Sequence, residues 1–301
     1  MFTNQETALL ERKVLSLTKP FVNAQNNSIF FAVDSVTKSR MAIDIGNTNI
    51  VFGIFKGKTL KISWRLTTWP DRTADELWVV LSHLFSGEGL NIDEIDGVIV
   101  ASVVPPLTQI VTEMVTHRFG CKTLCVDAGN SGLTIQYENP DEVGADRLVN
   151  GVAAFELYGA GSRPVMVADF GTATTFDVIS PRREYLGGVI CPGVEISADA
   201  LFQRAARLPR VELRRPSAVI GRTTVASMQS GLFFGHVAMV EGIVTRLCEA
   251  LPAEGRPVCI GTGGLAEAIA EETKAIDHVN RDLTLVGLQL VWELNTQPQT
   301  A

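Results

Sequence analysis

Met41-Ala-Ile-Asp-Ile-Gly-Asn-Thr-Asn-Ile-Val-Phe-Gly-Ile-Phe55 is the segment from which the architecture of this chain can be predicted. It contains two apolar runs rich in β-branched and aromatic residues, separated by the polar turn Gly-Asn-Thr, which is the pattern of two strands joined by a tight connection. Lys56 and Gly57 form the next turn, and residues 60–66 read as a third strand. The segment therefore predicts a meander of three antiparallel strands.

The residues after the meander predict alternating helices and strands. Thr73 with Glu76 three positions later is a helix-capping pattern ahead of an apolar helix. A strand is expected over residues 96–102, and Pro105 begins the next helix because proline is favoured in a first turn. Residues 122–127 read as a further strand.

The same order of elements begins again near residue 165. A strand over 165–170 ends in Asp169-Phe-Gly171, and two more strands are expected over 172–179 and 185–190. Aspartate and glycine occupy the same places here as Asp44 and Gly46 do after the first strand. Two copies of one α/β domain, with matching turns on either side of a cleft, explain this repetition. Two unrelated hairpins are the alternative.

The composition excludes several classes of protein. Of 301 residues, 46% are hydrophobic and 20% are charged, as in ordinary globular proteins and unlike wholly disordered chains. The formal charge of −7 argues against binding of nucleic acid by bulk attraction to phosphate, although a local cluster of donors could still hold a small anion. The five cysteines are scattered and do not form a disulfide framework. With no apolar run near the ~20 residues of a membrane span and no secretory signal, we expect no membrane partner and a cytoplasmic location.

The first forty residues differ from the rest by their polar, turn-prone stretches. We interpret residues 1–40 as an N-terminal extension or as the result of a misassigned start, with Met41 as the alternative first residue. The two copies of the fold are then expected over residues 41–157 and 158–301.

Two familiar nucleotide-binding patterns can be tested against their context. Gly57-Lys58-Thr59 resembles the end of a P-loop, but position 52, where that loop needs glycine, is Phe52, so a simple turn is predicted. Residues 261–266 match the dinucleotide fingerprint between an apolar strand and a helix. Because they lie near the end of the chain, they predict nucleotide contact and not an NAD domain.

The turn after Asp44 has the composition of a phosphate-binding loop. A carboxylate at the end of a buried strand can hold hydrated Mg²⁺, and the following Gly, Asn and Thr offer backbone N–H groups to phosphate oxygens. The alternative is a tight turn capped by aspartate. The second acidic turn at Asp169 favours a phosphate clamp with two sides.

Gly144-Ala145-Asp146-Arg147 places a carboxylate and a guanidinium together just before an apolar helix. Asp146 could accept a proton from an attacking hydroxyl, with Arg147 binding polar groups of the substrate. Asp146 could equally be a helix cap and Arg147 the partner of a neighbouring carboxylate. The spacing alone does not decide between these readings.

Taken in order, these motifs resemble those of the type III pantothenate kinases, a family of the acetate and sugar kinase/Hsc70/actin superfamily. The matching segments begin at Asp44, Arg72, Tyr137, Asp169, Gly187 and Gly261. The resemblance implies duplicated ribonuclease-H-like (actin-like ATPase) domains, with mixed sheets flanked by helices and an interdomain cleft. It also implies a reaction in which ATP phosphorylates the terminal hydroxyl of pantothenate to give 4′-phosphopantothenate, the first step of coenzyme A biosynthesis.

The resemblance further implies roles for individual residues. Asp146 would be the catalytic proton acceptor, Asp44 would hold Mg²⁺, and Asp169 would bind a monovalent cation, K⁺ or NH₄⁺. Pantothenate would be contacted by Tyr137, Gly144, Ala145, Asp146, Arg147 and Thr224, although Thr223 is an alternative to Thr224. ATP would be contacted by Asp44, Ile45, Gly46, Asn47, Thr48, Asn49, Ile50, Val51 and Thr172. The family is dimeric with substrate sites near the subunit interface, so we expect a homodimer.

Two rival functions share parts of this pattern. Other kinases or phosphatases of the superfamily act on sugars or acyl phosphates, but they are not expected to carry the segment from Tyr137 to Arg147. A transcription accessory or partner-binding protein with a vestigial nucleotide site is the second rival. The intact Asp44, Asp146 and Asp169 favour the kinase.

Overall fold

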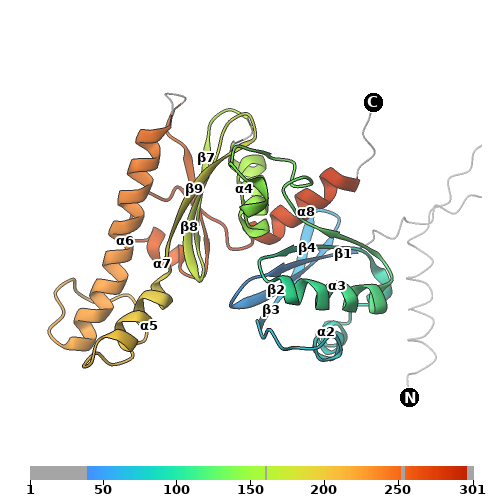
Figure 1. The fold of residues 1–301 in the computed structure, drawn as a ribbon, viewed down its shortest axis with the longest axis horizontal. Helices are drawn as coiled ribbons and strands as arrows, with labels where there is room; N and C mark the ends of the chain where they lie inside the picture. The colour runs from blue at the N-terminus through green and yellow to red at the C-terminus, as the bar shows by residue number, and fades with distance from the viewer. Residues whose placement is uncertain (1–38, 160, 252–254, 297–301) are drawn as a thin grey trace, which may run out of the picture. The chain divides into compact units, whose positions relative to one another are not determined.

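The computed structural model describes residues 39–159, 161–251 and 255–296, which form two β-sheets with helices packed on them (Figure 1). The expected extension, residues 1–40, lies outside the described residues except for Ser39 and Arg40. These two residues open the first strand.

The first sheet contains the predicted meander. Its strands are β1 (Ser39–Ile45), β2 (Asn49–Lys56), β3 (Thr59–Thr67), β4 (Ile95–Ser102) and β5 (Lys122–Cys125). They lie in the order β3-β2-β1-β4-β5, with β1 to β3 antiparallel and β4 and β5 parallel to β1. Gly57 has a φ of 62° in the β2–β3 turn, which confirms that Gly57-Lys58-Thr59 is a turn.

Alternation along β1 explains how the first sheet is covered. Met41, Ile43 and Ile45 point to one face and are fully buried against α2 (Ala74–Gly87) and α3 (Pro105–Phe119). The predicted capping box at the start of α2 is confirmed, because Thr73 N donates to Glu76 Oε2 at 2.8 Å and Glu76 N donates to Thr73 Oγ1 at 3.3 Å.

The second sheet repeats the topology of the first. Its strands are β6 (Thr134–Ile135), β7 (Val165–Phe170), β8 (Ala173–Ile179), β9 (Glu184–Pro192), β10 (Val258–Gly263) and β11 (His278–Val279), in the order β11-β10-β7-β8-β9-β6. With β6 set aside, β9-β8-β7-β10-β11 has the same order and the same strand directions as β3-β2-β1-β4-β5. The predicted duplication of a ribonuclease-H-like fold is therefore confirmed.

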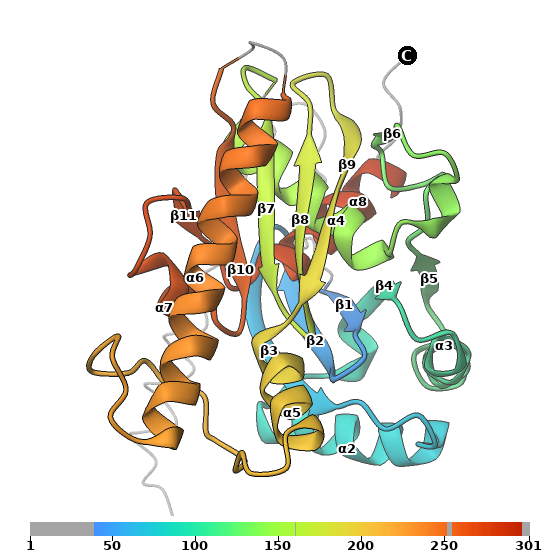
Figure 2. The ribbon, with the colours of Figure 1, turned by 60° about the vertical axis from the view of Figure 1, so that its left-hand side comes forward.

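The second sheet is covered on both faces (Figure 2). One face packs against α4 (Ala145–Ala154), which runs on into a π-helical turn (Phe155–Gly159). The other packs against α6 (Thr224–Ala250) and α7 (Ala266–Ala270), with α5 (Val194–Arg204) beside α6. By length and composition alone α6 could cross a membrane, and its residues Phe233, Val237 and Val240 are buried against this sheet.

The last helix of the described residues, α8 (Leu283–Thr296), packs on β1 and β4 of the first sheet and on α4. Helices α4 and α8 share a core with residues of both sheets, including Ala42 and Val167 (Figure 1). Elements on each side of residue 157 thus pack on both sheets, and the boundary between residues 157 and 158 stays a prediction.

Candidate active site

The two acidic turns face each other across one cavity, as the repeat predicts. Asp44 near the end of β1 and Asp169 near the end of β7 both line a cavity of about 480 Å³ between the sheets. The hydroxyl oxygens of Thr48 and Thr172, one from each turn, lie 2.6 Å apart. The cavity is therefore bordered by backbone and hydroxyl groups on two sides.

The first turn is fixed by Thr68, the residue directly after β3. Gly46 N donates to Asn49 O at 2.9 Å, Thr68 N donates to Thr48 O at 2.9 Å, and the Thr68 hydroxyl donates to Gly46 O at 2.7 Å. Among the predicted ATP-contacting residues, Asp44, Gly46, Asn47, Thr48, Asn49 and Val51 line the cavity. Ile45 and Ile50 do not line it, because their side chains are fully buried in the core under α2 and α3.

A glycine at the end of β10 completes the opposite wall. Gly263 has a φ of 88°, and a Cβ atom there would lie 2.7 Å from Asp169 Oδ1 and 2.6 Å from the Phe170 carbonyl. Only glycine permits this close approach. Gly263 and Gly264 line the cavity beside Thr172, where the fingerprint-like motif predicted nucleotide contact.

Asp146 enters the same cavity from the first turn of α4. Its Oδ1 accepts a hydrogen bond from Arg147 N at 2.8 Å, and a Cβ at Gly144 would lie 2.5 Å from that oxygen. Burial raises the pKa of Asp146, against the opposing effects of this N–H group and of the Arg147 charge. Ala145 is buried in the core shared by the sheets.

The carboxylates in the cavity raise one another's affinity for protons. Burial is the largest cause that raises the pKa of Asp44 to about 8, followed by the charges of Asp146 and Asp169, while Arg65 opposes the shift. Burial also raises the pKa of Asp169 to about 7, together with the charges of Asp146 and Asp177. Cations bound here would therefore favour the ionised forms.

The donor set suits cations that take only part of their ligands from protein. Among the residues that the structure describes, no group of three or more His, Cys, Asp or Glu could hold a metal ion. Mg²⁺ commonly keeps several waters and uses one or two carboxylates together with substrate phosphates. Asp44 is a single carboxylate that lines a cavity beside the two turns predicted to bind phosphate, and it fits that preference.

Asp169 is held by a residue that the sequence analysis missed. Asn150 Nδ2 donates to Asp169 Oδ2 at 3.0 Å, and Thr284 Oγ1 donates to Asn150 Oδ1 at 2.8 Å. Asn150 follows Asp146 by one turn of α4, so its position on the same helix face was a signal that could have been used.

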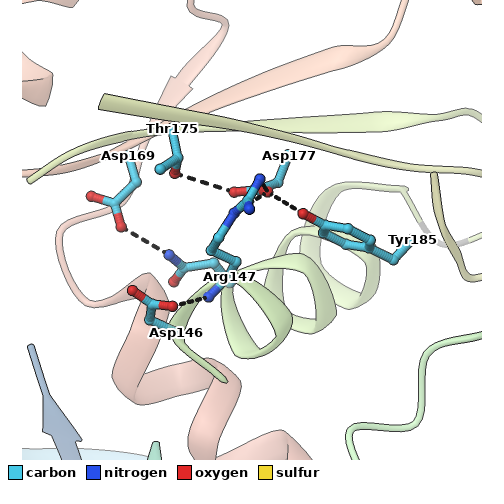
Figure 3. Close-up of polar contacts among 7 residues, drawn as sticks. Asp146, Arg147, Asp169, Thr175, Asp177 and Tyr185 are labelled. Carbon is cyan, nitrogen blue, oxygen red and sulfur yellow. Dashed lines mark hydrogen bonds and ion pairs between the residues drawn. The ribbon is translucent and has the colours of Figure 1, made fainter. Parts of the chain in front are cut away.

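Arg147 turns away from the cavity lining and pairs with Asp177 (Figure 3). Arg147 Nε donates to Asp177 Oδ1 at 2.8 Å, and the Tyr185 hydroxyl donates to the same oxygen at 2.6 Å. The ring of Tyr137 lies 6.2 Å from that of Tyr185. The alternative in which Arg147 pairs with a neighbouring carboxylate therefore describes its contact with Asp177.

Thr224 is not brought together with Arg147 or Tyr137. It is exposed in the first turn of α6, on the face of the second sheet opposite to α4. Thr223 is the N-cap of α6, and its hydroxyl accepts a hydrogen bond from Ala226 N at 3.1 Å. Thr223 is therefore engaged in capping, and the hydroxyl of Thr224 is the more available of the two.

Arg65 is a cavity residue that the sequence analysis also missed. In the strand register Asp44 pairs with Val51 and Val51 pairs with Arg65, so the three side chains lie in one row on one face of the sheet. Ser63, Arg65, Glu195 and Arg281 all line the cavity. The alternation of polar residues along β3 was the available signal.

Comparison with known proteins adds sequence relatives and structural neighbours. A profile of the family described as type III pantothenate kinase matches residues 40–246. Proteins named type III pantothenate kinase are similar over most of the chain. The relative from Moorella thermoacetica is 53% identical over 257 residues, which is 85% of this chain and 99% of the relative. The one from Geobacter sulfurreducens is 48% identical over 258 residues, with the same coverage of both chains.

Structural neighbours are more distant in sequence and bear on the fold alone. A Campylobacter jejuni protein assigned to the Baf family of transcriptional activators superposes with a TM-score of 0.54 at 18% identity, over 85% of this chain and 98% of the other. A Sinorhizobium meliloti protein assigned as a 2-dehydro-3-deoxygalactonokinase gives a TM-score of 0.51 at 12% identity, over 87% and 98%. These likenesses agree with the expected fold of mixed sheets flanked by helices.

Proposed function

The chain belongs to the type III pantothenate kinase family, and on that premise we propose that the cavity between its two sheets phosphorylates pantothenate with Asp146 as proton acceptor. The activity that goes with this family is ATP-dependent phosphorylation of pantothenate to 4′-phosphopantothenate, the first step of coenzyme A biosynthesis. The observation that carries the proposal is that Asp146 shares one cavity with both acidic turns.

The nucleotide phosphates would bind between the two turns. Residues 46–49 and the hydroxyls of Thr48 and Thr172 border this part of the cavity. Asp44 would hold Mg²⁺, which when bound neutralises phosphate charge, and Asp169 would hold a monovalent cation, K⁺ or NH₄⁺. Because ATP is an intracellular nucleotide, the same proposal puts the enzyme in the cytoplasm.

Asp146 would take the proton of the attacking hydroxyl. The hydroxyl oxygen of pantothenate forms a bond to the γ-phosphorus, the bond from that phosphorus to the β–γ bridging oxygen breaks, and ADP leaves. The hydroxyl proton passes to Asp146, whose Oδ1 is fixed by Arg147 N. The raised pKa of Asp146 suits a base that must hold a proton during the transfer.

A second copy of the chain is the partner that we propose for the exposed apolar surface near α5 and α6. Of the twelve large hydrophobic side chains that are exposed among the described residues, eight lie between residues 186 and 225. Ile220 is 82% exposed and Val219 is 66% exposed. Thr224 lies in the same segment, so a subunit seated there would stand close to a residue expected to contact pantothenate.

The homodimer can be tested by mass in solution. The double variant Val219→Asp with Ile220→Asp is expected to shift the protein from dimer to monomer in light scattering. Val79→Asp is the matched control, because Val79 is 57% exposed on α2, outside this segment. A monomeric parent protein, or a dimer unaffected by the double change, would contradict the proposed interface.

The activity is tested by following phosphate transfer from ATP in the presence of Mg²⁺ and K⁺. Pantothenate should be the preferred acceptor against a panel of sugars and acetate. Transfer to a sugar or to acetate, with none to pantothenate under any cation condition, would favour another kinase of the superfamily. No transfer at all would favour a partner-binding protein with a vestigial site.

A further inference from the structure

A buried polar cluster of Arg147, Asp177, Tyr185 and Thr175 connects α4 to the second sheet, and Thr175 is its member that lines the cavity. Asp177 is fully buried at its centre, and Arg147 is 8% exposed. Arg147 Nε donates to Asp177 Oδ1 at 2.8 Å, while Nη2, buried and without a hydrogen bond of good geometry, lies 2.7 Å from the same oxygen (Figure 3). One carboxylate thus engages two of the three guanidinium nitrogens.

Asp177 is in turn held by two hydroxyl groups. The Tyr185 hydroxyl donates to Oδ1 at 2.6 Å, and the Thr175 hydroxyl donates to Oδ2 at 3.2 Å (Figure 3). The Arg147 guanidinium also lies 5.9 Å from the Tyr185 ring centroid. A buried charge pair is retained at low cost only where its remaining lone pairs are satisfied, and these hydroxyls do that.

The alternation of β8 explains why these groups face α4. Asp177 and Ile179 point to the face that α4 covers, whereas Phe176 and Val178 point to the face that α6 covers. On neighbouring β9, Gly188 leaves the room that the guanidinium needs, because a Cβ there would lie 2.8 Å from Arg147 Nη2.

We propose that Asp177, supported by Tyr185 and Thr175, is a positioning residue that fixes the Arg147 guanidinium for contact with the acceptor substrate. The inference rests on the proposed function, in which Arg147 contacts pantothenate. Asp177 takes Nε and Nη2, so Nη1 is the nitrogen left for substrate among the contacts between described residues. Because Arg147 follows Asp146 directly, a fixed guanidinium also fixes where the acceptor lies relative to the base.

The pairing also defines what kind of group Arg147 recognises. Asp177 neutralises the guanidinium charge within the buried pair, so Arg147 acts there as an oriented N–H donor and not as a net positive charge. Such a donor suits an uncharged hydroxyl or amide oxygen of pantothenate near the transferred phosphoryl group. The carboxylate of pantothenate would then bind to residues other than Arg147.

The test compares kinetic constants for the two substrates. Asp177→Asn keeps the shape of the side chain but removes its charge, and it should raise KM for pantothenate roughly tenfold or more, since hydrogen bonds to charged groups are among the stronger ones. KM for ATP should change less than about twofold. Tyr185→Phe removes one support without changing charge and should raise KM for pantothenate by a smaller factor. It also keeps the test decisive if Asp177→Asn does not fold.

Thr174→Val is the matched structural control. Thr174 directly precedes Thr175 on β8 and is 1% exposed. Its hydroxyl lies 3.0 Å from His236 Nε2, on the opposite face of the sheet. Its substitution removes a buried polar contact of the same strand and should leave KM for pantothenate unchanged. If Asp177→Asn raises KM for pantothenate and for ATP by the same factor, and Thr174→Val does the same, Asp177 is only structural. That result would overturn the proposal.

The double variant Arg147→Gln with Asp177→Asn separates this inference from the proposed function. If Asp177 acts through Arg147, the double variant should have the same KM for pantothenate as Arg147→Gln alone. Fully additive effects would overturn the positioning role of Asp177. If Arg147→Gln leaves KM for pantothenate unchanged, the assignment of Arg147 within the proposed function is the part that fails.

Discussion

The hydroxyl oxygens of Thr48 and Thr172 lie 2.6 Å apart, although 124 residues separate them in the chain. Thr48 belongs to the turn after β1 and Thr172 to the turn after β7, and β1 and β7 are the equivalent central strands of the two sheets. The contact brings together the two turns between which we place the nucleotide phosphates. Phosphate oxygens bound there would replace this mutual hydrogen bond with two bonds of their own.

The first prediction concerns these two hydroxyls. Thr172→Val should raise KM for ATP about fivefold, because one hydrogen bond is worth about 1 kcal/mol, and it should leave KM for pantothenate nearly unchanged. Steady-state kinetics with each substrate varied in turn provides the measurement. Thr116→Val, on the exposed surface of α3, is the control and should match the parent protein. A rise in KM for pantothenate alone would mean that Thr172 contacts pantothenate and not ATP, and would contradict the prediction.

The second prediction concerns the proton acceptor. Asp146→Asn should lower kcat by roughly 10²- to 10⁴-fold, the usual contribution of a general base, while both KM values change little. Circular dichroism and thermal unfolding should show an intact fold, because asparagine can still accept the hydrogen bond from Arg147 N. A variant with near-normal kcat would refute the role of Asp146 as base.

The third prediction follows from the raised pKa values of Asp44, about 8, and Asp169, about 7. Both carboxyl groups bind protons more tightly in the folded chain than in the unfolded chain, so their contribution to stability is greatest in acid. It is lost as pH rises through the folded pKa values. In the absence of divalent cations, Tm should therefore fall as pH rises from about 4, near the ordinary carboxyl pKa of 3.8, to about 8.

The control for this pH dependence is a change of charge at the same site. Asp44→Asn cannot titrate, so its Tm should depend less steeply on pH than that of the parent protein. Asp75→Asn removes an exposed carboxylate that pairs with Arg118 and should leave the slope unchanged. If Asp44→Asn and Asp75→Asn have the same slope as the parent, Asp44 does not titrate in this range.

The sequence predicted the repeated parts of the site better than the parts that connect them. Asp44 and Asp169 could be placed because each ends a strand whose partner strands follow directly in the chain, so local patterns determine where they lie. Asp177 could not be assigned to Arg147, because that pairing depends on which face of β8 meets α4, a contact between segments 30 residues apart.

Two further features depend on tertiary packing that local patterns do not encode. Thr224 and Arg147 both belong to motifs of the resemblance, yet they lie on opposite faces of the second sheet. The return of α8 to the first sheet was also missed. This helix buries Leu285, Leu288 and Val291 in the core shared by both sheets, and nothing in its sequence identifies which sheet it covers.

The fourth prediction tests the monovalent cation proposed at Asp169. Parent activity should rise when K⁺ or NH₄⁺ replaces Na⁺ at constant ionic strength. Asp169→Asn should abolish this dependence along with most of the activity, because the amide lacks the charge that attracts the cation. Asp199→Asn, an exposed residue of α5 paired with Arg210, is the control and should keep the cation response. An unchanged response to K⁺ in Asp169→Asn would locate the cation elsewhere.

The last prediction concerns the packing of α8 against α4, the helix that carries Asp146 in its first turn. Gly287 allows the two helices to approach closely, since a Cβ there would lie 2.0 Å from the Val149 carbonyl oxygen. Gly287→Ala must push α8 away from α4, and overpacking of this kind typically costs about 1–3 kcal/mol. Because Val149 follows Asp146 by three residues, kcat should fall along with the free energy of unfolding. Gly87→Ala at the end of α2, where an added methyl group meets nothing within 4 Å, should be neutral or slightly stabilising in chemical denaturation. Equal stability of Gly287→Ala and the parent protein would show that α8 can move without disturbing α4, and that the position of Asp146 does not depend on this helix pair.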